Sequence, residues 1–382
     1  MENPKIRFKG FTKDWEQRKL GEILEYEQPG PYIVDSTDYD NSYSTPVLTA
    51  GQSFILGYTN ETAGIKKATP DNPVIIFDDF TTSSHYVDFS FKVKSSAMKF
   101  LTLKNDTDDI YCINNVLENI DYIPASHERH WISIFTNFDV RVPSSREEQK
   151  SIGDYFRNLD NLITLHQRKC EQTKKLKKYM LQKMFPRNGA KVPEIRFDGF
   201  TYDWEQRKFS ELYARSSEKN DGSIGMDKNI TVATMQFKND VKVSTTEYLK
   251  TYYTFKLGDI AFEGHQSKEF RYGRFVENDI GNGIVSHIFA VFRPIQEYDL
   301  YFWKYAINNE TLMQRILARS TKASTMMHDL VTNDFLNETF LVPSVKEQKQ
   351  IGAFLNKLDN IITLHQRQTD FYKKISFYYI SS

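Results

Sequence analysis

Residues 142–168 read VPSSREEQKSIGDYFRNLDNLITLHQR, and residues 342–367 read VPSVKEQKQIGAFLNKLDNIITLHQR. In each copy a proline ends the preceding element, and the serine directly after it can cap a new helix. Apolar residues then recur at alternating steps of four and three, which is the spacing of a helix that packs along one side. The two stretches therefore predict two long helices of the same design.

The apolar seam has the same spacing in both predicted helices. Its members are Ile152, Phe156, Leu159, Ile163 and His166 in the first helix and Ile351, Leu355, Leu358, Ile362 and His365 in the second. An unbroken helix from Glu147 to Phe185 would be roughly 58 Å long, which suits a spacer better than a core helix. We expect the two helices to pack as an antiparallel coiled coil. The two histidines are interpreted as interfacial residues rather than as metal ligands or a pH switch.

A second repeated motif precedes each helix. The string DWEQRK occupies residues 14–19 and again residues 203–208, and each copy follows Ile-Arg-Phe and Gly-Phe-Thr. We call residues 6–19 and 195–208 the tryptophan motifs. Each half of the chain therefore consists of a tryptophan motif, a variable region, Val-Pro-Ser and a long helix. The predicted organisation is a domain over residues 1–145, a helix over 146–190, a second domain over 191–345 and a second helix over 346–382.

The two variable regions do not resemble each other, but both predict mixed structure. In the first, residues 74–77 and 86–93 have the apolar or alternating patterns of strands, and residues 114–120 predict a short helix. In the second, the predicted strands are residues 230–233, 255–262 around a turn at Gly258, and 288–292, with a helix over residues 299–319. We expect an α+β fold in which two such domains form a tandem repeat about a pseudo-twofold axis.

The composition is that of a soluble globular protein, with 40% apolar and 26% charged residues. Lys+Arg and Asp+Glu both number 50, so the formal charge is zero, which argues against a nucleic-acid binder that works alone. The sequence contains neither a run of about 18 apolar residues nor a signal peptide. Cys112 and Cys170 are too few for a disulfide framework. We therefore expect a cytoplasmic protein.

Motifs of nucleotide, metal and nuclease chemistry are missing or incomplete. The sequence has no Gly-x-x-x-x-Gly-Lys loop and no Asn-Pro-Pro-Tyr or Asp-Pro-Pro-Tyr, the motif of amino-methyltransferases. Gly281 and Gly283 lack the third glycine of a dinucleotide loop, and His127 and His130 lack further metal ligands. The Asp-Asp pairs at 78–79 and 108–109 have no Glu-x-Lys partner. We expect no catalytic residue and no metal site in this chain.

Polar and basic loops at strand or helix ends are the candidate DNA contacts. Gln, Asn, Arg and Lys can read base edges, and Ser, Thr and Lys can hold phosphates, although any one such loop can equally be a solvated turn. The candidates are Thr81, Thr82, Ser83, Ser84, His85, Arg129 and His130 in the first region and Gln236, Lys238, His265, Gln266, Ser267, Lys268, Arg271, Arg274, Lys322, Ser324 and Thr325 in the second.

The first long helix is basic toward its end. Residues 146–191 contain twelve Lys or Arg against five Asp or Glu, and Lys174, Lys175, Lys177 and Lys178 form the densest part. A solvated helix face and a contact with phosphate or a partner explain this charge equally well.

The doubled motifs resemble the specificity subunit of type I restriction-modification enzymes, and the resemblance covers the whole chain. It rests on Phe-x-Gly-Phe-x-x-x-Trp-Glu-Gln-Arg-Lys, found twice, and on Val-Pro-Ser followed, after two or three intervening residues, by Glu-Gln-Lys, with its Leu-Asp-Asn-x-Ile-Thr-Leu-His-Gln-Arg helix, also found twice. One departure is visible, because the first helix ends in residues 179–186, YMLQKMFP, whereas residues 377–382 read FYYISS.

The resemblance implies two target recognition domains separated by two helices, with each domain reading one half of a split DNA site. It implies partners that this chain lacks: two modification subunits that methylate adenine from S-adenosylmethionine, and restriction subunits that use ATP and Mg. It also implies a non-catalytic chain whose helices set the spacing and dock the modification subunits. The alternatives are a coiled-coil scaffold that never touches DNA and an enzyme that modifies or cuts DNA by itself.

Overall fold

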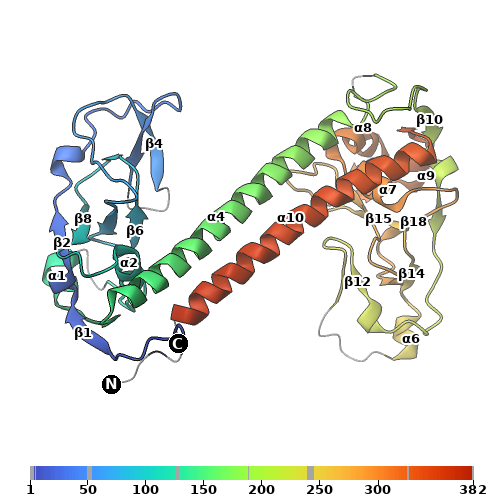
Figure 1. Ribbon diagram of the computed structural model, residues 1–382. Helices are drawn as coiled ribbons and strands as arrows, with labels where there is room; N and C mark the ends of the chain where they lie inside the picture. The colour runs from blue at the N-terminus through green and yellow to red at the C-terminus, as the bar shows by residue number, and fades with distance from the viewer. Residues whose placement is uncertain are drawn as a thin grey trace. The chain divides into compact units, whose positions relative to one another are not determined.

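The computed structural model describes residues 4, 6–49, 54–124, 129–187, 189–238, 245–324 and 327–380. The chain divides into two units, the first formed by residues 1–167 and 367–382 and the second by residues 168–366 (Figure 1). Each unit therefore contains one mixed domain together with a segment of each long helix. None of the helices in the described ranges is long and apolar enough to cross a membrane.

The first unit begins with a domain of short elements. In chain order these are β1 (Trp15–Lys19), α1 (Leu20–Ile23), β2 (Leu24–Glu27), η1 (Gly30–Tyr32), β3 (Thr45–Leu48), β4 (Ile55–Thr59), β5 (Val74–Asp78), β6 (Ser84–Val87), β7 (Lys92–Val93), β8 (Met98–Leu103), α2 (Ile110–Glu118), α3 (His130–Ser133), η2 (Phe135–Asn137) and β9 (Asp139–Pro143). The long helix α4 (Arg146–Lys183) follows β9 after two residues.

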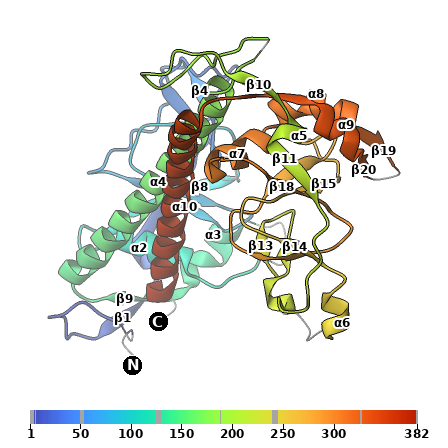
Figure 2. The ribbon, with the colours of Figure 1, turned by 90° about the vertical axis from the view of Figure 1, so that its right-hand side faces the viewer.

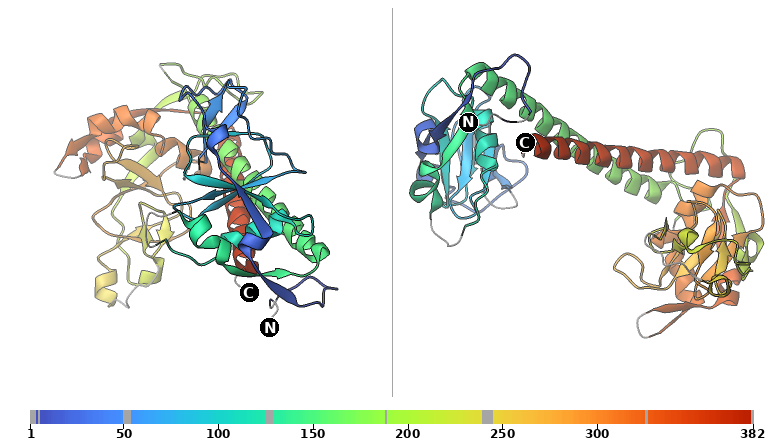
Figure 3. Two further views of the ribbon diagram at one scale, coloured as in Figure 1. Left: turned by 90° about the vertical axis from the view of Figure 1, so that its left-hand side faces the viewer. Right: turned by 90° about the horizontal axis from the view of Figure 1, so that it is seen from below.

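The central sheet of the first unit is antiparallel with strand order β2-β8-β5-β6. The first domain is drawn in blue and cyan in Figure 3. Strand β5 is buried on both faces, since successive side chains of a strand point to opposite sides. Ile75 and Phe77 pack with α1, α2 and Trp131 in one apolar cluster. Val74 and Ile76 pack in a second cluster on the other face, which includes residues of the small β4-β3-β7 sheet.

The second unit follows the same plan with more elements. In chain order these are β10 (Glu205–Lys208), α5 (Phe209–Leu212), β11 (Tyr213–Ser216), η3 (Met226–Lys228), β12 (Ile230–Thr231), β13 (Gln236–Phe237), α6 (Thr246–Leu249), β14 (Tyr253–Phe255), β15 (Ile260–Glu263), β16 (Arg274–Glu277), β17 (Gly283–Val285), β18 (Ala290–Pro294), α7 (Leu300–Ile307), α8 (Glu310–Ser320), β19 (Thr321–Ala323), β20 (His328–Leu330), α9 (Thr332–Asn337), β21 (Thr339–Val342) and the long helix α10 (Val345–Ile380).

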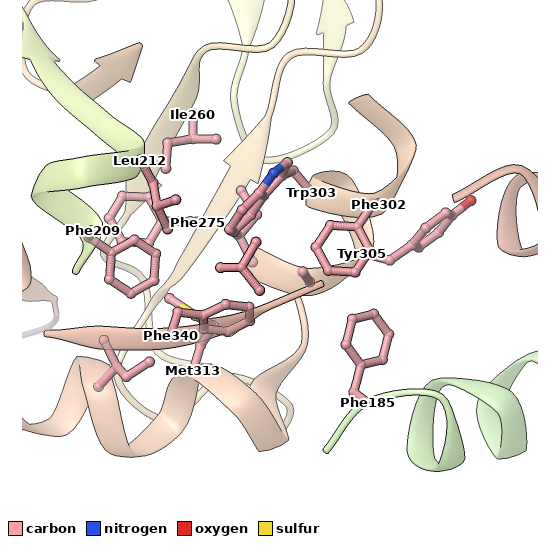
Figure 4. Packing of buried hydrophobic residues seen from close by; sticks show 14 of the residues in the cluster. Phe185, Phe209, Leu212, Ile260, Phe275, Phe302, Trp303, Tyr305, Met313 and Phe340 are labelled. Carbon is pink, nitrogen blue, oxygen red and sulfur yellow. The ribbon is translucent and has the colours of Figure 1, made fainter. Parts of the chain in front are cut away.

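The central sheet of the second unit is again antiparallel, with order β11-β18-β15-β16. Figure 2 labels β11, β18 and β15 of this sheet. Its helix side is closed by an aromatic cluster in which Phe209, Phe275, Phe302 and Trp303 are buried (Figure 4). Strand by strand, β11, β18, β15 and β16 take the places of β2, β8, β5 and β6. The two dissimilar variable regions therefore build the same sheet.

In each unit a segment of α4 lies beside a segment of α10, and the two segments run antiparallel. In the first unit the His166 ring lies 5.7 Å from the Tyr372 ring, while Phe156 and Leu159, earlier in α4, share a cluster with Ile375, later in α10. The same trend holds in the second unit, where Cys170 Sγ lies 4.0 Å from Ile362 O and Lys177 Nζ lies 2.6 Å from Asp359 Oδ1. The predicted α+β class, with paired domains and antiparallel long helices, is confirmed.

The repeated motifs fasten each domain to its own helix. Strand β1 of the first tryptophan motif pairs with β9 just before α4. The Arg7 guanidinium donates to both carboxylate oxygens of Glu148 at 2.5 and 2.7 Å, and Trp15 Nε1 donates to the same carboxylate at 3.3 Å. In the second unit the same contacts join Arg196 and Trp204 to Glu347 at 2.7, 2.9 and 3.3 Å. We call these two arrangements the arginine–glutamate clamps.

The Gln and Gly of the helix motif fit the helix against the domain. Gln149 Oε1 accepts a hydrogen bond from the backbone of Asp109, and Gln348 Oε1 accepts one from Asp299, at the N-caps of α2 and α7. A Cβ on Gly153 would stand 2.3 Å from an oxygen of the Asp109 carboxylate. These contacts explain why Glu-Gln and Ile-Gly recur in both copies.

Several predicted elements differ from those observed. The strand predicted over residues 86–93 is two strands, because β6 pairs with β5 whereas β7 pairs with β3. The helix predicted over residues 299–319 breaks between α7 and α8, where Asn309 caps α8. Strands β14 and β15 flank the turn at Gly258 but pair with different partners. Helix α2 starts at Ile110, before the predicted residues 114–120. Ile288 is exposed and precedes β18 rather than starting it.

Candidate nucleic-acid interface

The turn between β5 and β6 presents hydroxyl groups at one end of the first unit's sheet. Asp78 closes the turn, because its backbone N–H donates to Ser83 O and its carboxylate accepts from Phe80 and Thr81 N–H groups. Thr82 has φ of 61°, in the left-handed region that non-glycine residues rarely adopt. The hydroxyls of Thr81 and Ser83 lie 2.9 Å apart. The turn is therefore a compact, pre-shaped polar surface.

A buried ion pair holds this turn in place. Asp79 and Lys99 have fully buried side chains, with 2.8 Å between Lys99 Nζ and Asp79 Oδ2. Lys99 also donates to Gln28, and the other Asp79 oxygen accepts from the backbone of Trp131. Because a charge buried without its partner is costly, this pair fixes where the turn leaves the sheet.

The same Asp79 brings Arg129 toward the turn. The backbone N–H of His130 and its ring Nδ1 both lie within hydrogen-bond distance of Asp79 O, at 3.1 and 3.0 Å. Arg129, which directly precedes His130, is exposed and makes no ion pair with any residue that the structure describes. The structure thus joins two stretches that lie about 50 residues apart in the sequence, the Thr81–Ser83 turn and Arg129.

In the second unit the corresponding connection, between β15 and β16, lies against the β19–β20 hairpin. His265 forms an isolated β-bridge with Met327, and His328 N–H donates to Gly264 O at 2.8 Å. The hairpin carries Lys322 and Ser324, and the connection carries residues 265–268, all of them exposed. These contacts join two of the predicted polar segments into one surface.

Arg274 links a third predicted segment to that surface. Its guanidinium donates to Glu263 at 3.1 Å and to Ala233 O at 2.7 Å, and it lies over the Phe270 ring. Ala233 belongs to the turn before Gln236, which is exposed. Arg274 therefore organises the site, because its Nε and Nη2 groups both donate to partners within the protein.

The predicted contacts differ in how accessible the structure makes them. His130 is 1% exposed and Ser84 is 9% exposed, so neither side chain lies on the surface as a DNA contact requires. The His85 ring packs on Phe54 at 4.4 Å. The side chains of Gln266, Ser267, Lys268, Arg271, Lys322 and Ser324 are exposed, as are Gln236 and Lys238. Thr325 and His127 lie outside the described residues.

Aspartates of the two Asp-Asp pairs make contacts within the fold. Asp79 is paired with Lys99, and Asp108 accepts from Arg18 at 2.7 Å, so both of these carboxylates are structural. Asp109 caps α2. No group of three or more His, Cys, Asp or Glu in the described part of the chain is placed to hold a metal ion.

The predicted helix seam has a second role that periodicity did not reveal. Ile351, Leu355 and Leu358 belong to the large core of the second unit, where they contact the domain as well as helix α4. Phe156 and Leu159 likewise pack against Tyr111 of α2. The start of each helix is therefore part of its domain core.

A tyrosine–aspartate contact is the functional feature that sequence reasoning missed. Tyr111 Oη donates to Asp160 at 2.5 Å, and Tyr305 Oη donates to Asp359 at 2.6 Å. Burial, with the nearby carboxylate, raises the pKa of each tyrosine. Both aspartates belong to the repeated Leu-Asp-Asn, which was the available signal, but the tyrosines occupy different positions in α2 and α7.

The basic end of α4 is only partly free for a partner. Lys177 pairs with Asp359 and lies over the Tyr305 ring at 4.8 Å, while Lys174 pairs with Glu171. Lys175 and Lys178 are exposed and form no ion pair within the described ranges. Two of the four lysines thus serve the fold.

Comparison with known proteins gives a consistent picture. A model of the type I restriction modification DNA specificity domain matches residues 12–175 and again residues 202–370. The EcoR124I/EcoR124II specificity subunit of Escherichia coli is 44% identical over 163 residues, which are 41% of this chain and 39% of that subunit. The chain thus spans about two fifths of the length of that relative.

Two further similarities extend over nearly the whole chain. The MjaVIII specificity subunit of Methanocaldococcus jannaschii is 22% identical over 387 residues, covering 94% of this chain and 89% of that subunit. The crystal structure of a type I restriction-modification S subunit from M. genitalium superposes with a TM-score of 0.70 at 13% identity, covering 99% of this chain and 98% of that one. At this identity the structural likeness concerns the fold.

Proposed function

Because the chain belongs to the type I restriction modification DNA specificity family, we propose that it is the DNA-recognition subunit of such a complex and that each unit reads one half of a bipartite site. The observation that supports the proposal is the contrast between a frame that both units share and loops that differ between them. The same sheet, clamp and helix occur twice, whereas the loops at the β5–β6 and β15–β16 ends share no sequence. A shared frame with different loops suits two different half-sites.

The proposed contacts are polar groups of these loops that are exposed or, in the case of Ser83, half-buried. In the first unit they are Thr81, Ser83 and Arg129, and in the second Lys268, Lys322 and Gln236. An Arg or Lys can donate to guanine, and a Gln can pair with adenine, whereas hydroxyls suit phosphates. The zero formal charge fits a subunit whose partners supply part of the positive surface around the DNA.

An exchange of one variable region tests this proposal. Residues 20–138 would be replaced by the matching region of a relative, which leaves β1, β9 and the Arg7–Glu148 clamp in place. The exchange should change one half of the methylated motif and leave the other half and the gap unchanged. Sequencing of methylated adenines in cells that also produce the modification subunits gives the readout. A change in both halves together would contradict the modular reading.

The long helices are proposed to set the distance between half-sites. Helix α4 has 38 residues and α10 has 36, so each is about 55 Å long. Insertion of four residues after Arg168 must be matched by four after Gln366, because the segments pack antiparallel. This double insertion should widen the gap in the methylated motif by one or two base pairs, since each base pair adds about 3.4 Å. An unchanged gap with active methylation would assign the spacing to the partners.

The proposed partners are two modification subunits and the restriction subunits. S-adenosylmethionine, ATP and Mg are assigned to those subunits rather than to this chain, which the proposal treats as non-catalytic. A methylation assay with purified chain alone and then with modification subunits tests this division. Methyl transfer by the chain alone would contradict it.

A further inference from the structure

The second unit contains a pocket of about 420 Å³ where the end of helix α4 meets helix α8 and strand β21. Apolar and polar side chains both line it. The apolar part includes Phe185 and Phe340, which are labelled in Figure 4, together with Leu312. A volume of about 300–1,000 Å³ is usual for pockets that bind small molecules. The pocket is therefore large enough for a small organic ligand.

Two arginines line this pocket without an acidic partner. Arg187 follows α4 and Arg315 lies in α8, and neither forms an ion pair within the described ranges. Arg187 Nε is buried and donates to no acceptor, which is costly for a charged donor. None of the described residues that line the pocket is Asp or Glu. The pocket therefore concentrates positive charge that the fold leaves unneutralised.

Other arginines of the second unit show how unusual this is. Five of them pair with a carboxylate, namely Arg196, Arg207, Arg274, Arg293 and Arg319. The two pocket arginines thus lack the partner that is usual in this unit.

Two threonine hydroxyls add further donors to the lining. Thr339 Oγ1 accepts from Gln206 Nε2 at 2.8 Å, which leaves the hydroxyl hydrogen of Thr339 able to donate. The exposed Thr311 hydroxyl makes no hydrogen bond with the described residues. Guanidinium and hydroxyl groups are the side-chain donors that hold phosphate oxygens, and the planar fork of arginine matches two of them at once. The polar lining therefore suits an oxyanion.

We propose that this pocket binds a small organic phosphate monoester. Arg187, Arg315 and the threonine hydroxyls would hold the phosphate, and the organic part would lie against Phe185 and Phe340. A phosphate monoester carries about −1.5 to −2 charges near neutral pH, which matches two arginines better than a carboxylate does. A terminal phosphate is attached on one side only and can enter a pocket, whereas the phosphodiesters of a duplex continue on both sides.

A set of matched small molecules tests the ligand class. Phenyl phosphate, titrated into the full chain by calorimetry at constant ionic strength, should bind saturably at one site. Benzoate should bind roughly tenfold more weakly, and phenol should not bind. The affinity for phenyl phosphate should rise from about pH 5 to about pH 7, because a phosphate monoester loses its second proton near pH 6. Equal affinity for benzoate, or no saturable binding, would overturn the proposal.

Substitutions in the lining test the location. Arg187→Gln and Arg315→Gln should each weaken phenyl phosphate roughly tenfold. Arg168→Gln is the control, since Arg168 on α4 is exposed and forms no ion pair with a described residue but lies outside the pocket. Equal weakening by the control would show that general charge attracts the ligand, which would contradict the site.

A fourth variant borrows a residue from the first unit. Asp139 holds the place of Thr339, because Asp139 pairs with Lys19 as Thr339 pairs with Lys208. Thr339→Asp should therefore be tolerated by the strand, and its carboxylate should repel the phosphate and abolish binding. Thermal unfolding checks that the variant is folded. Undiminished binding by the folded variant would overturn the proposal.

Competition with duplex DNA separates this pocket from the proposed recognition surface, and this arm rests on the proposed function. A duplex added to the complex with the modification subunits should leave the affinity for phenyl phosphate unchanged. Displacement by the duplex would assign the pocket to the DNA backbone and would overturn the small-ligand proposal. Failure to bind DNA at all would contradict the proposed function, while the titrations with the chain alone would still decide the phosphate site.

Discussion

In both units a tyrosine–aspartate contact holds the domain to a long helix, but the side chains around that contact differ. In both, the aspartate of Leu-Asp-Asn accepts a tyrosine hydroxyl from the neighbouring domain helix, and a cation covers the tyrosine ring. In the first unit the cation is Arg157, 4.9 Å from the centre of the Tyr111 ring and four residues along from Gly153 on the same helix. In the second it is Lys177, from the other long helix. The aspartate is the same in both units, whereas the cation beside the tyrosine comes from a different helix in each.

The recognition loops differ more deeply. Lys99 and Ala290 occupy equivalent positions, because Lys99 pairs with Phe77 and Ala290 pairs with Phe262. Two residues further along, Asp79 corresponds to Gly264, where an added Cβ would stand 2.2 Å from His328 O. The first unit holds its loop with a buried ion pair, and the second holds it with close backbone contact. Two sheets with the same strand order can therefore carry loops that are held in place by unrelated contacts.

The largest effect should follow from breaking the ion pair that only the first unit has. Lys99→Met would leave Asp79 buried without a partner, which costs about 3–5 kcal/mol. Denaturant unfolding with hydrogen exchange on β5 and β8 would measure the loss. Lys66→Met is the control, because Lys66 pairs with a Glu27 side chain that is 44% exposed, and such a pair contributes less than about 1 kcal/mol. Equal losses would show that the buried pair is not the anchor.

The next-largest effect should come from adding a methyl group to the glycine near the start of each long helix, because the two units should lose different amounts of stability. In Gly352→Ala the new Cβ would lie 2.2 Å from the Asp299 carboxylate and 2.6 Å from Phe302 N, whereas Gly153→Ala has only one contact below 3.0 Å. Overpacking of this kind costs about 1–3 kcal/mol, and the second unit should lose more. Thermal unfolding of the two variants gives the order. A larger loss from Gly153→Ala would contradict the contact geometry.

Loss of one exposed cation in each unit should affect one half-site each. Arg129→Ala should relax a position in the first half-site, and Lys322→Ala one in the second, at about 1–3 kcal/mol for a base contact. Binding of the assembled complex to duplexes with single substitutions measures this. Arg319→Ala is the control, since Arg319 is already paired with Glu338. A uniform loss with a smaller salt slope would identify a phosphate contact instead.

A buried acid, Glu277, should give the second unit a pH dependence that Tyr86, at the matching position, does not give the first. Glu277 occupies the place of Tyr86, is 2% exposed and has no hydrogen-bond partner for either oxygen among the described residues. Burial raises the pKa of Glu277 well above its usual value. The folded state therefore keeps a proton that the unfolded state loses, so stability falls as pH rises above about 4.5.

The variant Glu277→Gln should remove that dependence. The difference in unfolding free energy between variant and native chain should grow by up to about 1.4 kcal/mol for each pH unit, until the pH passes the folded pKa. Denaturant unfolding between pH 5 and about 8 would show it. A constant difference across this range would mean that Glu277 is ionised in the fold.

The smallest effect concerns the ion pair between helix segments of the second unit. Lys177→Met should cost less than about 1 kcal/mol, since both side chains are partly exposed and salt screens the pair. The first unit has Ser376 at the position equivalent to Lys177. Ser376→Lys should then gain a similar amount in low salt, measured as a shift in thermal unfolding. A gain that persists at high salt would point to packing rather than charge.

The frame was predictable from sequence, whereas the assembly of the loops was not. Periodicity and repetition identified both long helices, because such signals lie within a few residues of one another. The contacts of Asp79 with Lys99 and His130 join residues 20 to 51 positions apart, and nothing local marks them. The His265–Met327 bridge likewise spans two segments that the sequence treats separately. His130 was predicted to face DNA because it lies in a polar stretch, yet the backbone of Asp79 draws it inside.

The arginine–glutamate clamp also has a mechanical consequence. Helix α4 leaves the first domain directly from β9, and β9 is paired to β1 over five residues while Glu148 holds Arg7. Tension along α4 would therefore load the β1–β9 ladder and the clamp in shear. The Thr81–Ser83 turn and its Lys99–Asp79 anchor lie outside this load path. A molecule pulled by its helix would keep the shape of that turn until the clamp ruptured.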